Sequence, residues 1–307
     1  MPEPRVIELG RERRLLDLDF RDTEGLVAAY LLPEPEGWAL VETGPTSCRS
    51  ALLRAVAAAG VEPEQVRDIF VTHIHLDHAG GLGAIADGFP RARLFAHELG
   101  VPHLADPSRL VASARRVWGD AMDRLWGSVV PAPAARLRGL RGGERFPLRN
   151  GELQVLATPG HAKHHLSFVD SGLHAVLTGD SAGVRLERSA RIRPAVPPPD
   201  LDLDQLLSSL EVMRAAEPRL VLLSHFGPTE HGAADLTTYG QIVERWRQVA
   251  LVAAREKPDA AYIASRLAEA DPPEPGDRSA LVSGYEVAAQ GLLRYFQTHG
   301  ELPEAAT

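Results

Sequence analysis

Short apolar runs that end in polar or glycine-rich turns fill the first two thirds of the chain, and they constrain its fold more than any other feature. The runs are rich in Val, Leu and Phe, and their length and composition are typical of buried β-strands. We predict strands at residues 26–32, 38–43, 68–73, 92–97, 153–158, 165–170, 174–179 and 219–225.

Helical patterns lie between some of these strands. The segment "CRSALLRAVAAAG" (48–60) contains good helix formers and ends at a glycine. The segment 200–218 opens with acidic residues, which favour a helix N-terminus, and it ends at a proline. Strands mixed with helices in this way predict an α/β fold, in which helices cover the faces of the sheets.

The pattern changes after His225, where helical segments follow one another without strands between them. We therefore predict a main domain over residues 1–230 and a helical C-terminal extension over residues 231–307 that packs on it. The predicted helices of the extension span 235–256, 259–270 and 281–300.

Residues 98–150 separate two of the predicted strands and form a long insertion. Within it, Trp118, Met122, Leu125 and Trp126 are spaced as on one face of a helix. We expect this face to pack against the body of the protein. The alternative is that it forms a wall of a substrate pocket.

The composition excludes several classes of function. A net charge of −8 makes the chain a poor general binder of nucleic acids or anionic membranes. No apolar run approaches the roughly 20 residues that span a bilayer, and the charged N-terminus is unlike a signal peptide. Cys48 is the single cysteine, so no intrachain disulfide can form and a cytoplasmic location is expected.

The segment "VTHIHLDHAGG" (71–81) combines three histidines and an aspartate at the end of a predicted strand. Because side chains alternate along an extended segment, His73 and His75 point the same way. Asp77 and His78 follow where the glycines allow the chain to turn. Imidazole and carboxylate groups are common metal ligands, so this segment predicts a metal site rather than a surface cluster of histidines.

Three other predicted strands end in residues that can bind a metal. They deliver His161 after a Thr-Pro-Gly turn, Asp180 after Thr-Gly, and His225 after a serine. Each of these alone would be interpreted as an ordinary loop residue. Three such strand ends, in a chain that already contains the histidine segment, indicate one shared site.

These motifs, in this order, resemble the metallo-beta-lactamase superfamily, over about residues 20–230. The matching motifs are "ALVETG" (39–44), "THIHLDH" (72–78), "TPGH" (158–161), "TGD" (178–180) and "SH" (224–225). The resemblance implies a four-layer αββα sandwich with the metals at one edge, between the two sheets, and it makes residues 1–230 the catalytic domain.

The resemblance also implies a ligand set for two metal ions, joined by a water or hydroxide. It assigns His73, His75 and His161 to the first metal, Asp77, His78 and His225 to the second, and Asp180 to the bridge between them. Glu42 departs from the family pattern, which has an aspartate at this position in a supporting role. We expect the metals to bind nevertheless, with altered contacts around the ligands.

The subgroup follows from the same comparison. A bridging carboxylate such as Asp180 is similar to that of thioesterases, lactonases and phosphodiesterases of the superfamily, whereas true β-lactamases usually carry a different residue. The helical C-terminal extension resembles that of the broad glyoxalase II-like group. The stretch that contacts glutathione in dedicated glyoxalase II enzymes is missing after Asp180.

Two metals roughly 3.5–4 Å apart can share a hydroxide and polarise a substrate oxygen. We therefore predict a dinuclear hydrolase whose bridging hydroxide attacks a small acyl substrate, such as a thioester, lactone or ester, with Asp77 as the catalytic residue that orients the hydroxide. The alternatives are a phosphodiesterase at the same site and an iron-dependent oxidoreductase of the same fold. Zinc is the expected metal, and iron and manganese are alternatives because the same ligands accept all three.

Two further histidines lie close to the motifs. His165 follows His161 by four residues, and we expect a structural histidine on the next strand. His231 follows His225 by six residues, and we expect it in an exposed loop. Contact with the substrate is the alternative for His164 and Lys163. The expected partner is a small molecule, and the oligomeric state is left open.

Overall fold

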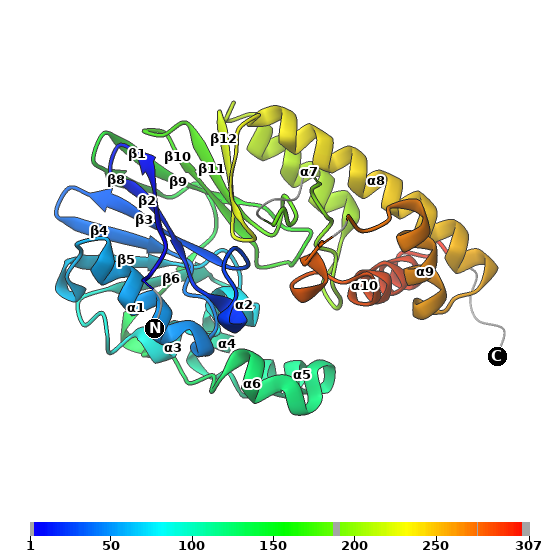
Figure 1. Cartoon of the computed structure of the whole chain (residues 1–307), viewed down its shortest axis with the longest axis horizontal. Coiled ribbons are helices and arrows are strands. Elements are labelled where there is room, and N and C mark those ends of the chain that lie inside the picture. The colour runs from blue at the N-terminus through cyan, green and yellow to red at the C-terminus, as the bar shows by residue number, and fades with distance from the viewer. Residues whose placement is uncertain (1–2, 187–190, 275, 303–307) are drawn as a thin grey trace.

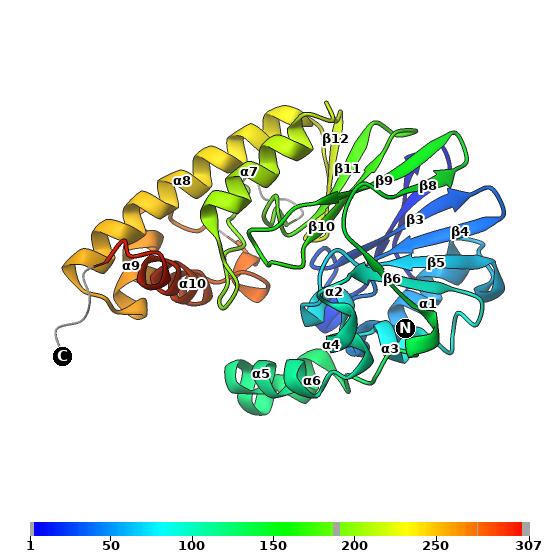
Figure 2. The same cartoon turned by 180° about the vertical axis from the view of Figure 1, so that it is seen from behind.

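Two β-sheets face each other at the centre of the protein, and helices cover the outer face of each sheet (Figures 1 and 2). The structure is a computed structural model that describes residues 3–186, 191–274 and 276–302. The layers run from helices through both sheets to helices again. The predicted αββα sandwich of the α/β class, with helices at the C-terminal end of the chain, is therefore confirmed.

The strands of the first sheet follow one another in space in the same order as in the chain. Strands β1 to β4 pair antiparallel, and β4 to β7 pair parallel. Parallel strands are covered on both faces, which explains the continuous apolar run in β4. The bounds are β1 (Val6–Gly10), β2 (Arg13–Asp17), β3 (Ala28–Glu34), β4 (Gly37–Val41), β5 (Val66–Phe70), β6 (Arg93–His97) and β7 (Leu137–Leu140).

The second sheet has the order β13-β12-β11-β10-β9-β8, and its pairs are antiparallel except for the parallel pair of β11 and β12. A helix connects β11 to β12, as a parallel crossover requires. The bounds are β8 (Arg145–Leu148), β9 (Gly151–Ala157), β10 (Leu166–Asp170), β11 (Ala175–Gly179), β12 (Leu220–Leu223) and β13 (Gly227–Thr229).

Helices α1 to α6 lie on the side of the first sheet, and α7 and α8 lie along the second sheet (Figure 1). Helices α8, α9 and α10 pack on one another, and α8 also contacts α7 and β12. The bounds are α1 (Arg49–Ala58), α2 (Leu76–Ala79), α3 (Leu82–Ile85), α4 (Val101–Ala105), α5 (Ser108–Trp118), α6 (Met122–Trp126), α7 (Leu203–Arg214), α8 (Ala233–Glu256), α9 (Ala260–Ala270) and α10 (Tyr285–Thr298).

All eight predicted strands and all five predicted helices are present, with ends that differ by a few residues. Residues 303–307 of the predicted extension lie outside the described residues. Within the described residues, no helix is both long and apolar enough to cross a bilayer.

The prediction of one insertion over residues 98–150 is wrong in part. Strand β7 closes the edge of the first sheet and β8 begins the second, so only the part that contains α4, α5 and α6 is inserted. The single helix predicted through Trp118 and Trp126 is also interrupted, because Gly119 adopts a positive φ of 49° and a 3-10 turn follows. Trp126 is buried, whereas Trp118 is 37% exposed.

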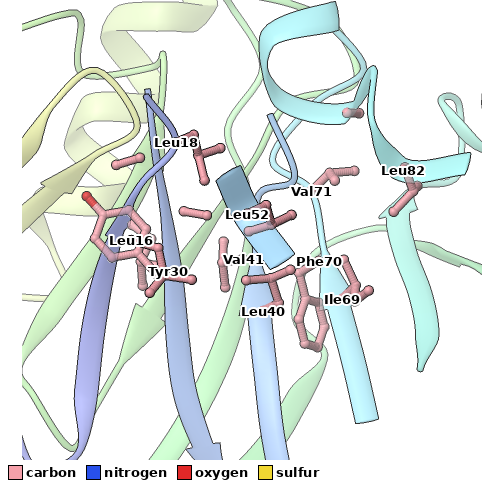
Figure 3. Close-up of a cluster of buried hydrophobic side chains, with 14 of the residues drawn as sticks. Leu16, Leu18, Tyr30, Leu40, Val41, Leu52, Ile69, Phe70, Val71 and Leu82 are labelled. Carbon is pink, nitrogen blue, oxygen red and sulfur yellow. The ribbon is translucent and has the colours of Figure 1, made fainter. Parts of the chain in front are cut away.

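A large apolar core surrounds the first sheet and continues into the space between the sheets. Figure 3 shows part of this core, where Leu40 of β4 and Ile69 of β5 lie near Leu52 of α1. Tyr30 of β3 crosses to the second sheet and donates its hydroxyl to the carbonyl oxygen of Leu223 at 2.5 Å. A second core lies between the second sheet and helices α7 to α10.

A buried ion pair also joins the two sheets. Arg13 of β2 donates from Nε and Nη2 to the carboxylate of Asp170, at the end of β10, at 2.8 and 3.0 Å. Both side chains are fully buried. The remaining Arg13 donor, Nη1, binds the carbonyl oxygens of Arg11 and Arg149. The guanidinium therefore replaces the water that it loses on burial with protein acceptors.

We expect the substitution Arg13→Met to lower the free energy of unfolding by about 3–5 kcal/mol, because Asp170 would remain buried without its partner. Chemical denaturation measures this loss. The matched control is Arg214→Met, which breaks an exposed ion pair with Glu211 on α7 and should change stability far less. Equal losses in the two variants would contradict the structural role of the buried pair.

Candidate metal centre

The histidine segment lies where the chain leaves the first sheet for the second. Strand β5 ends at Phe70, three residues earlier than predicted. The Thr72 amide binds the carboxylate of Glu42 instead of a neighbouring strand, and its carbonyl oxygen accepts from the amide of Leu166 at the start of β10. His73 and His75 therefore lie in a loop between the sheets, and Asp77 and His78 lie in α2, where the sequence predicted a turn.

The other three predicted ligands converge on this loop from the ends of strands. His161 follows β9, Asp180 follows β11 and His225 follows β12. Gly179 is required before Asp180, because it has a positive φ of 51° and an added Cβ would lie 2.6 Å from His165 Nε2 and Thr72 Oγ1. The structure thus brings together all seven side chains that the sequence singled out.

Three histidines form the first group of donor atoms. The Nδ1 atom of His75 lies 2.9 Å from Nε2 of His73 and 3.0 Å from Nε2 of His161. Ligands at about 2.05 Å from a tetrahedral metal ion are separated by about 3.3 Å. The three nitrogens are therefore close to the spacing that one metal ion requires.

The second group contains Asp77, His78 and His225. The Nε2 atom of His225 lies 3.3 Å from Nε2 of His78 and 3.3 Å from Oδ2 of Asp77. His78 Nε2 lies 3.8 Å from the same carboxylate oxygen. These separations also suit a single cation, with an anionic ligand beside two neutral ones.

Asp180 lies between the two groups. Its Oδ1 atom is 3.4 Å from His78 Nε2 and 3.6 Å from His225 Nε2, and its Oδ2 atom is 3.6 Å from His161 Nε2. Among the described residues, Oδ1 is buried and has no hydrogen-bond partner. Burial raises the pKa of Asp180, but His78, His225 and His161 outweigh this and hold it well below its usual value. An anionic oxygen that is buried without a donor is the fit expected for a site that binds cations.

Backbone carbonyl oxygens fix the orientation of two imidazoles. Nδ1 of His161 donates to the carbonyl oxygen of Ala195 at 2.8 Å, and Nδ1 of His225 donates to that of Leu26 at 2.7 Å. A carbonyl oxygen only accepts, so in each ring Nδ1 carries the hydrogen and the lone pair of Nε2 faces the site. Contacts of this kind orient metal-binding histidines.

Glu42 orients two further imidazoles whose Nε2 atoms face the site, those of His78 and His73. Its Oε1 atom accepts from Nδ1 of His78 at 2.9 Å and from the hydroxyls of Thr72 and Ser224 at 2.6 and 3.0 Å. Because the Thr72 hydroxyl gives its hydrogen to Glu42, its oxygen accepts from Nδ1 of His73 at 3.0 Å. The longer side chain that departs from the family pattern therefore reaches one histidine of each group.

His165 has the structural role that the sequence predicted. Its ring is fully buried, and Nδ1 contacts the hydroxyls of Thr158 and Ser181 at 2.9 and 3.0 Å. Its Nε2 atom accepts from the backbone amide of Asp180 at 3.2 Å. His165 thus supports the loop that carries Asp180. The expectation for His231 is also confirmed, since its side chain is exposed.

His164 follows the candidate ligand His161 by three residues, and its ring is buried. The ring is 4% exposed, and among the described residues its Nδ1 atom has no hydrogen-bond partner. Burial lowers the pKa of His164 to about 4. Lys163 is instead exposed and pairs with Asp200 at 3.4 Å. Contact of His164 or Lys163 with the substrate therefore stays a prediction.

The family profile described as Metallo-beta-lactamase superfamily matches residues 22–225. The chain belongs to this superfamily. The matched range contains all seven side chains of the candidate metal centre, and it ends at the last of them. The resemblance that the five motifs carried is therefore confirmed at the level of the superfamily.

Individual relatives agree with this assignment. The metallo-beta-lactamase fold-containing protein ST1585 of Sulfurisphaera tokodaii is 29% identical over 163 residues, which cover 52% of this chain and 60% of that protein. The match thus spans about three fifths of the relative's length. A hydroxyacylglutathione hydrolase of Xanthomonas euvesicatoria pv. vesicatoria is 29% identical over 130 residues, which cover 42% of this chain and 37% of that enzyme.

Among solved structures, a beta-lactamase domain protein from Burkholderia ambifaria superposes with a TM-score of 0.70. The superposition covers 96% of this chain and 90% of that one, at 22% sequence identity. This likeness extends the shared fold beyond the matched family region to the C-terminal helices.

Proposed function

We propose that the protein is a metal-dependent hydrolase that binds two divalent cations and cleaves small acyl substrates. The observation that carries this proposal is Asp180, whose buried carboxylate lies between two groups of donor atoms and has an oxygen with no hydrogen-bond partner in the part of the chain that the structure describes. His73, His75 and His161 would hold one cation, and Asp77, His78 and His225 the other. Zinc is the metal that we expect, since imidazole and carboxylate ligands suit it.

When bound, such a pair of cations supplies a hydroxide nucleophile at neutral pH and polarises the substrate oxygen. In this chain, Asp77 is the residue that we propose to orient the nucleophile and accept its proton. Its side chain is 17% exposed, compared with 9% for Asp180, so it is the more accessible of the two carboxylates. Burial raises the pKa of Asp77, but His78 and His225 outweigh this and hold it at about 2, so the side chain is an ionised carboxylate that can accept a hydrogen bond from the nucleophile.

The surroundings of the site favour an acyl compound with an apolar part. Four of the six large apolar side chains that the described residues expose belong to the insertion or its flanks: Leu99, Val117, Trp118 and Val130. The insertion begins beside the metal centre, because Gly100 packs so close to Ile74 that an added Cβ would lie 2.6 Å from Ile74 Cγ2. Ile74 stands between His73 and His75.

Helix α5 strengthens this argument. It is strongly amphipathic, yet none of its residues is fully buried, and its apolar side chains Leu110, Val111 and Ala114 are only partly covered. Exposed apolar side chains that lie together on one element are typical of a binding surface. We propose that it accommodates the apolar part of the substrate. The similarity to a hydroxyacylglutathione hydrolase supports thioesters within the acyl class.

A phosphodiesterase at the same site is the second candidate function. The transition state of phosphodiester cleavage carries extra negative charge and needs cationic side chains around it. The loops that carry the ligands contain few of them, and Lys163 already pairs with Asp200. An iron-dependent oxidoreductase of the same fold is the third candidate, and iron content together with oxygen uptake separates it from a hydrolase.

The test is a hydrolysis panel on protein loaded with zinc. We expect kcat/KM for acyl thioesters or lactones to exceed that for bis-(p-nitrophenyl) phosphate, and to rise as the acyl chain lengthens. Trp118→Ala should remove part of this rise and leave the shortest substrates unaffected, because it removes apolar surface and no ligand. Val252→Ala is a matched control, since Val252 is an exposed apolar residue on α8.

A clear preference for the phosphodiester would replace the acyl proposal with the second candidate. Hydrolysis of acyl substrates at rates that do not depend on chain length would retain the hydrolase but exclude a role for the insertion. Oxygen consumption without hydrolysis would favour the oxidoreductase.

A further inference from the structure

The carbonyl oxygen that orients His161 belongs to a segment with little structure of its own. Ala195 lies in residues 193–196, which begin at the isolated bridge between Arg193 and Val184 and precede three consecutive prolines. We name residues 193–196 the Ala195 segment. Because His161 Nδ1 donates to Ala195 at 2.8 Å, the position of this segment sets the direction of His161 Nε2.

Helix α8 contacts the Ala195 segment from one side. The amide of Ala195 donates to the hydroxyl of Tyr239 at 3.4 Å, and the Tyr239 side chain is fully buried. The same ring packs against the loop after Asp180, since an added Cβ on Gly183 would lie 2.4 Å from it. Tyr239 therefore lies between the Ala195 segment and the loop that carries Asp180.

The connection between α9 and α10 binds the segment from a second side. Asp277 accepts from Nη2 of Arg193 at 2.5 Å, and both side chains are 7% exposed. The guanidinium of Arg193 also lies 4.4 Å from the ring centre of Tyr285, a distance typical of a cation–π contact. The hydroxyl of Ser283 donates to the carbonyl oxygen of Pro194 at 2.9 Å.

Helix α10 contacts the Ala195 segment from a third side. At Gly291 the helix passes so close that an added Cβ would lie 2.0 Å from the carbonyl oxygen of Val196. All of these contacts come from residues after 230, which the sequence assigned to the C-terminal extension. The segment is thus held by three separate parts of the extension on either side of the residue that binds His161.

The second donor group has no comparable dependence on these helices. His225 is oriented by the carbonyl oxygen of Leu26, in the connection between β2 and β3, and His78 by Glu42 after β4. Both partners belong to the first sheet and its connections. The contacts that orient His225, His78 and, through Thr72, His73 therefore come from the first sheet and its connections, whereas the contact that orients His161 comes from the Ala195 segment.

We propose that the C-terminal helices position His161 through the Ala195 segment, so that retention of the cation bound by His73, His75 and His161 depends on them. This inference rests on the proposed binding of two cations. Arg193, Tyr239, Asp277 and Ser283 are positioning residues in this scheme, because the hydrogen bonds that they make hold the Ala195 segment and would act on the metal only through it.

The experiment titrates metal-free protein with Co²⁺ and follows the visible absorption of each bound ion. Asp277→Asn keeps the size of the side chain but removes the ion pair with Arg193, and Ser283→Ala removes the bond to Pro194. We expect both variants to weaken one of the two cobalt sites, by about 10–100-fold for Asp277→Asn, which is the usual range for residues that orient ligands. The spectral band that weakens should be the band lost in His161→Ala and retained in His225→Ala.

The matched control is Glu256→Gln. Glu256 accepts from Tyr262 and Arg266 within the same helices, and its side chain is 49% exposed. The Glu256→Gln variant should bind both ions as the wild type does. The inference is overturned if folded Asp277→Asn and Ser283→Ala bind both ions like the wild type, or if they weaken both sites equally. A wild-type chain that binds no cobalt overturns the proposed function as well. A wild type that binds two ions supports the binding of two cations, so the variants then test only the role of the Ala195 segment.

Discussion

Replacing Asp180 with alanine is expected to reduce kcat/KM on the best acyl substrate by about 10³-fold or more, which corresponds to about 4 kcal/mol of transition-state stabilisation. The two carboxylate oxygens of Asp180 approach histidines of both donor groups, at 3.4 to 3.6 Å. Without it, the site would lose the anion that lies between the two donor groups, and the repulsion between the two proposed cations would no longer be reduced.

Metal content provides the second measurement for this variant. The wild type should retain two zinc ions per chain after gel filtration, and Asp180→Ala fewer than two. Asp180→Asn distinguishes charge from shape, because the amide has nearly the same size as the carboxylate but no net charge. We expect it to resemble Asp180→Ala in activity.

The control for Asp180 is His231→Ala. His231 is an exposed histidine near the end of β13. The activity and metal content of the His231→Ala variant should stay close to those of the wild type. If His231→Ala and Asp180→Ala behaved alike, the separation between residues of the metal centre and neighbouring histidines would be wrong. A wild type that never exceeds one metal per chain would exclude the site with two cations.

The sequence singled out the candidate ligand side chains because their signals are local. Spacing within residues 71–81 reveals four of them, and an apolar run that ends in His or Asp reveals the others. The atoms that orient these ligands were not predictable in the same way. The carbonyl oxygens of Leu26 and Ala195 act through the backbone, which every residue possesses, so only the fold determines which of them face His225 and His161.

Four of the five strands that the sequence missed share a physical explanation. Strands β1, β7, β8 and β13 lie at the edges of the two sheets, where one side has no neighbouring strand and side chains are partly exposed. Edge strands need fewer apolar residues, so they lack a continuous apolar run. Strand β2 is different, since it is buried but contains Arg13, whose charge is paired with Asp170 in the other sheet. No local pattern predicts a partner 157 residues away.

Glu42 connects the predicted and the unpredicted parts of the site. The sequence identified it as a departure from the family pattern, and the structure places its carboxylate against Thr72, His78 and Ser224. It reaches both donor groups, His78 directly and His73 through Thr72. Its backbone has a positive φ of 73°, which is unusual for a residue with a side chain and suggests that the contacts of the carboxylate hold it there.

We expect Glu42→Ala to lower zinc affinity by about 10–100-fold, because two histidines lose the contacts that orient them. The metal-free protein should also lose stability, since each buried donor left without an acceptor costs about 1–3 kcal/mol. Glu42→Asp tests the length of the side chain. It restores the family residue but withdraws the carboxylate by one methylene from partners now at 2.6 to 3.0 Å, so we expect an affinity between those of the wild type and Glu42→Ala.

Competition with a chelator measures the zinc affinity, and thermal unfolding of the metal-free protein measures the loss of stability. Glu230→Ala is the control, because Glu230 is an exposed carboxylate on the protein surface and should change neither quantity. If Glu42→Asp bound zinc as tightly as the wild type, the surrounding backbone would adapt to either length, and the carboxylate itself would be the requirement. If Glu42→Ala also bound zinc like the wild type, the contacts of Thr72 and His78 with Glu42 would be structural and would not orient the metal ligands.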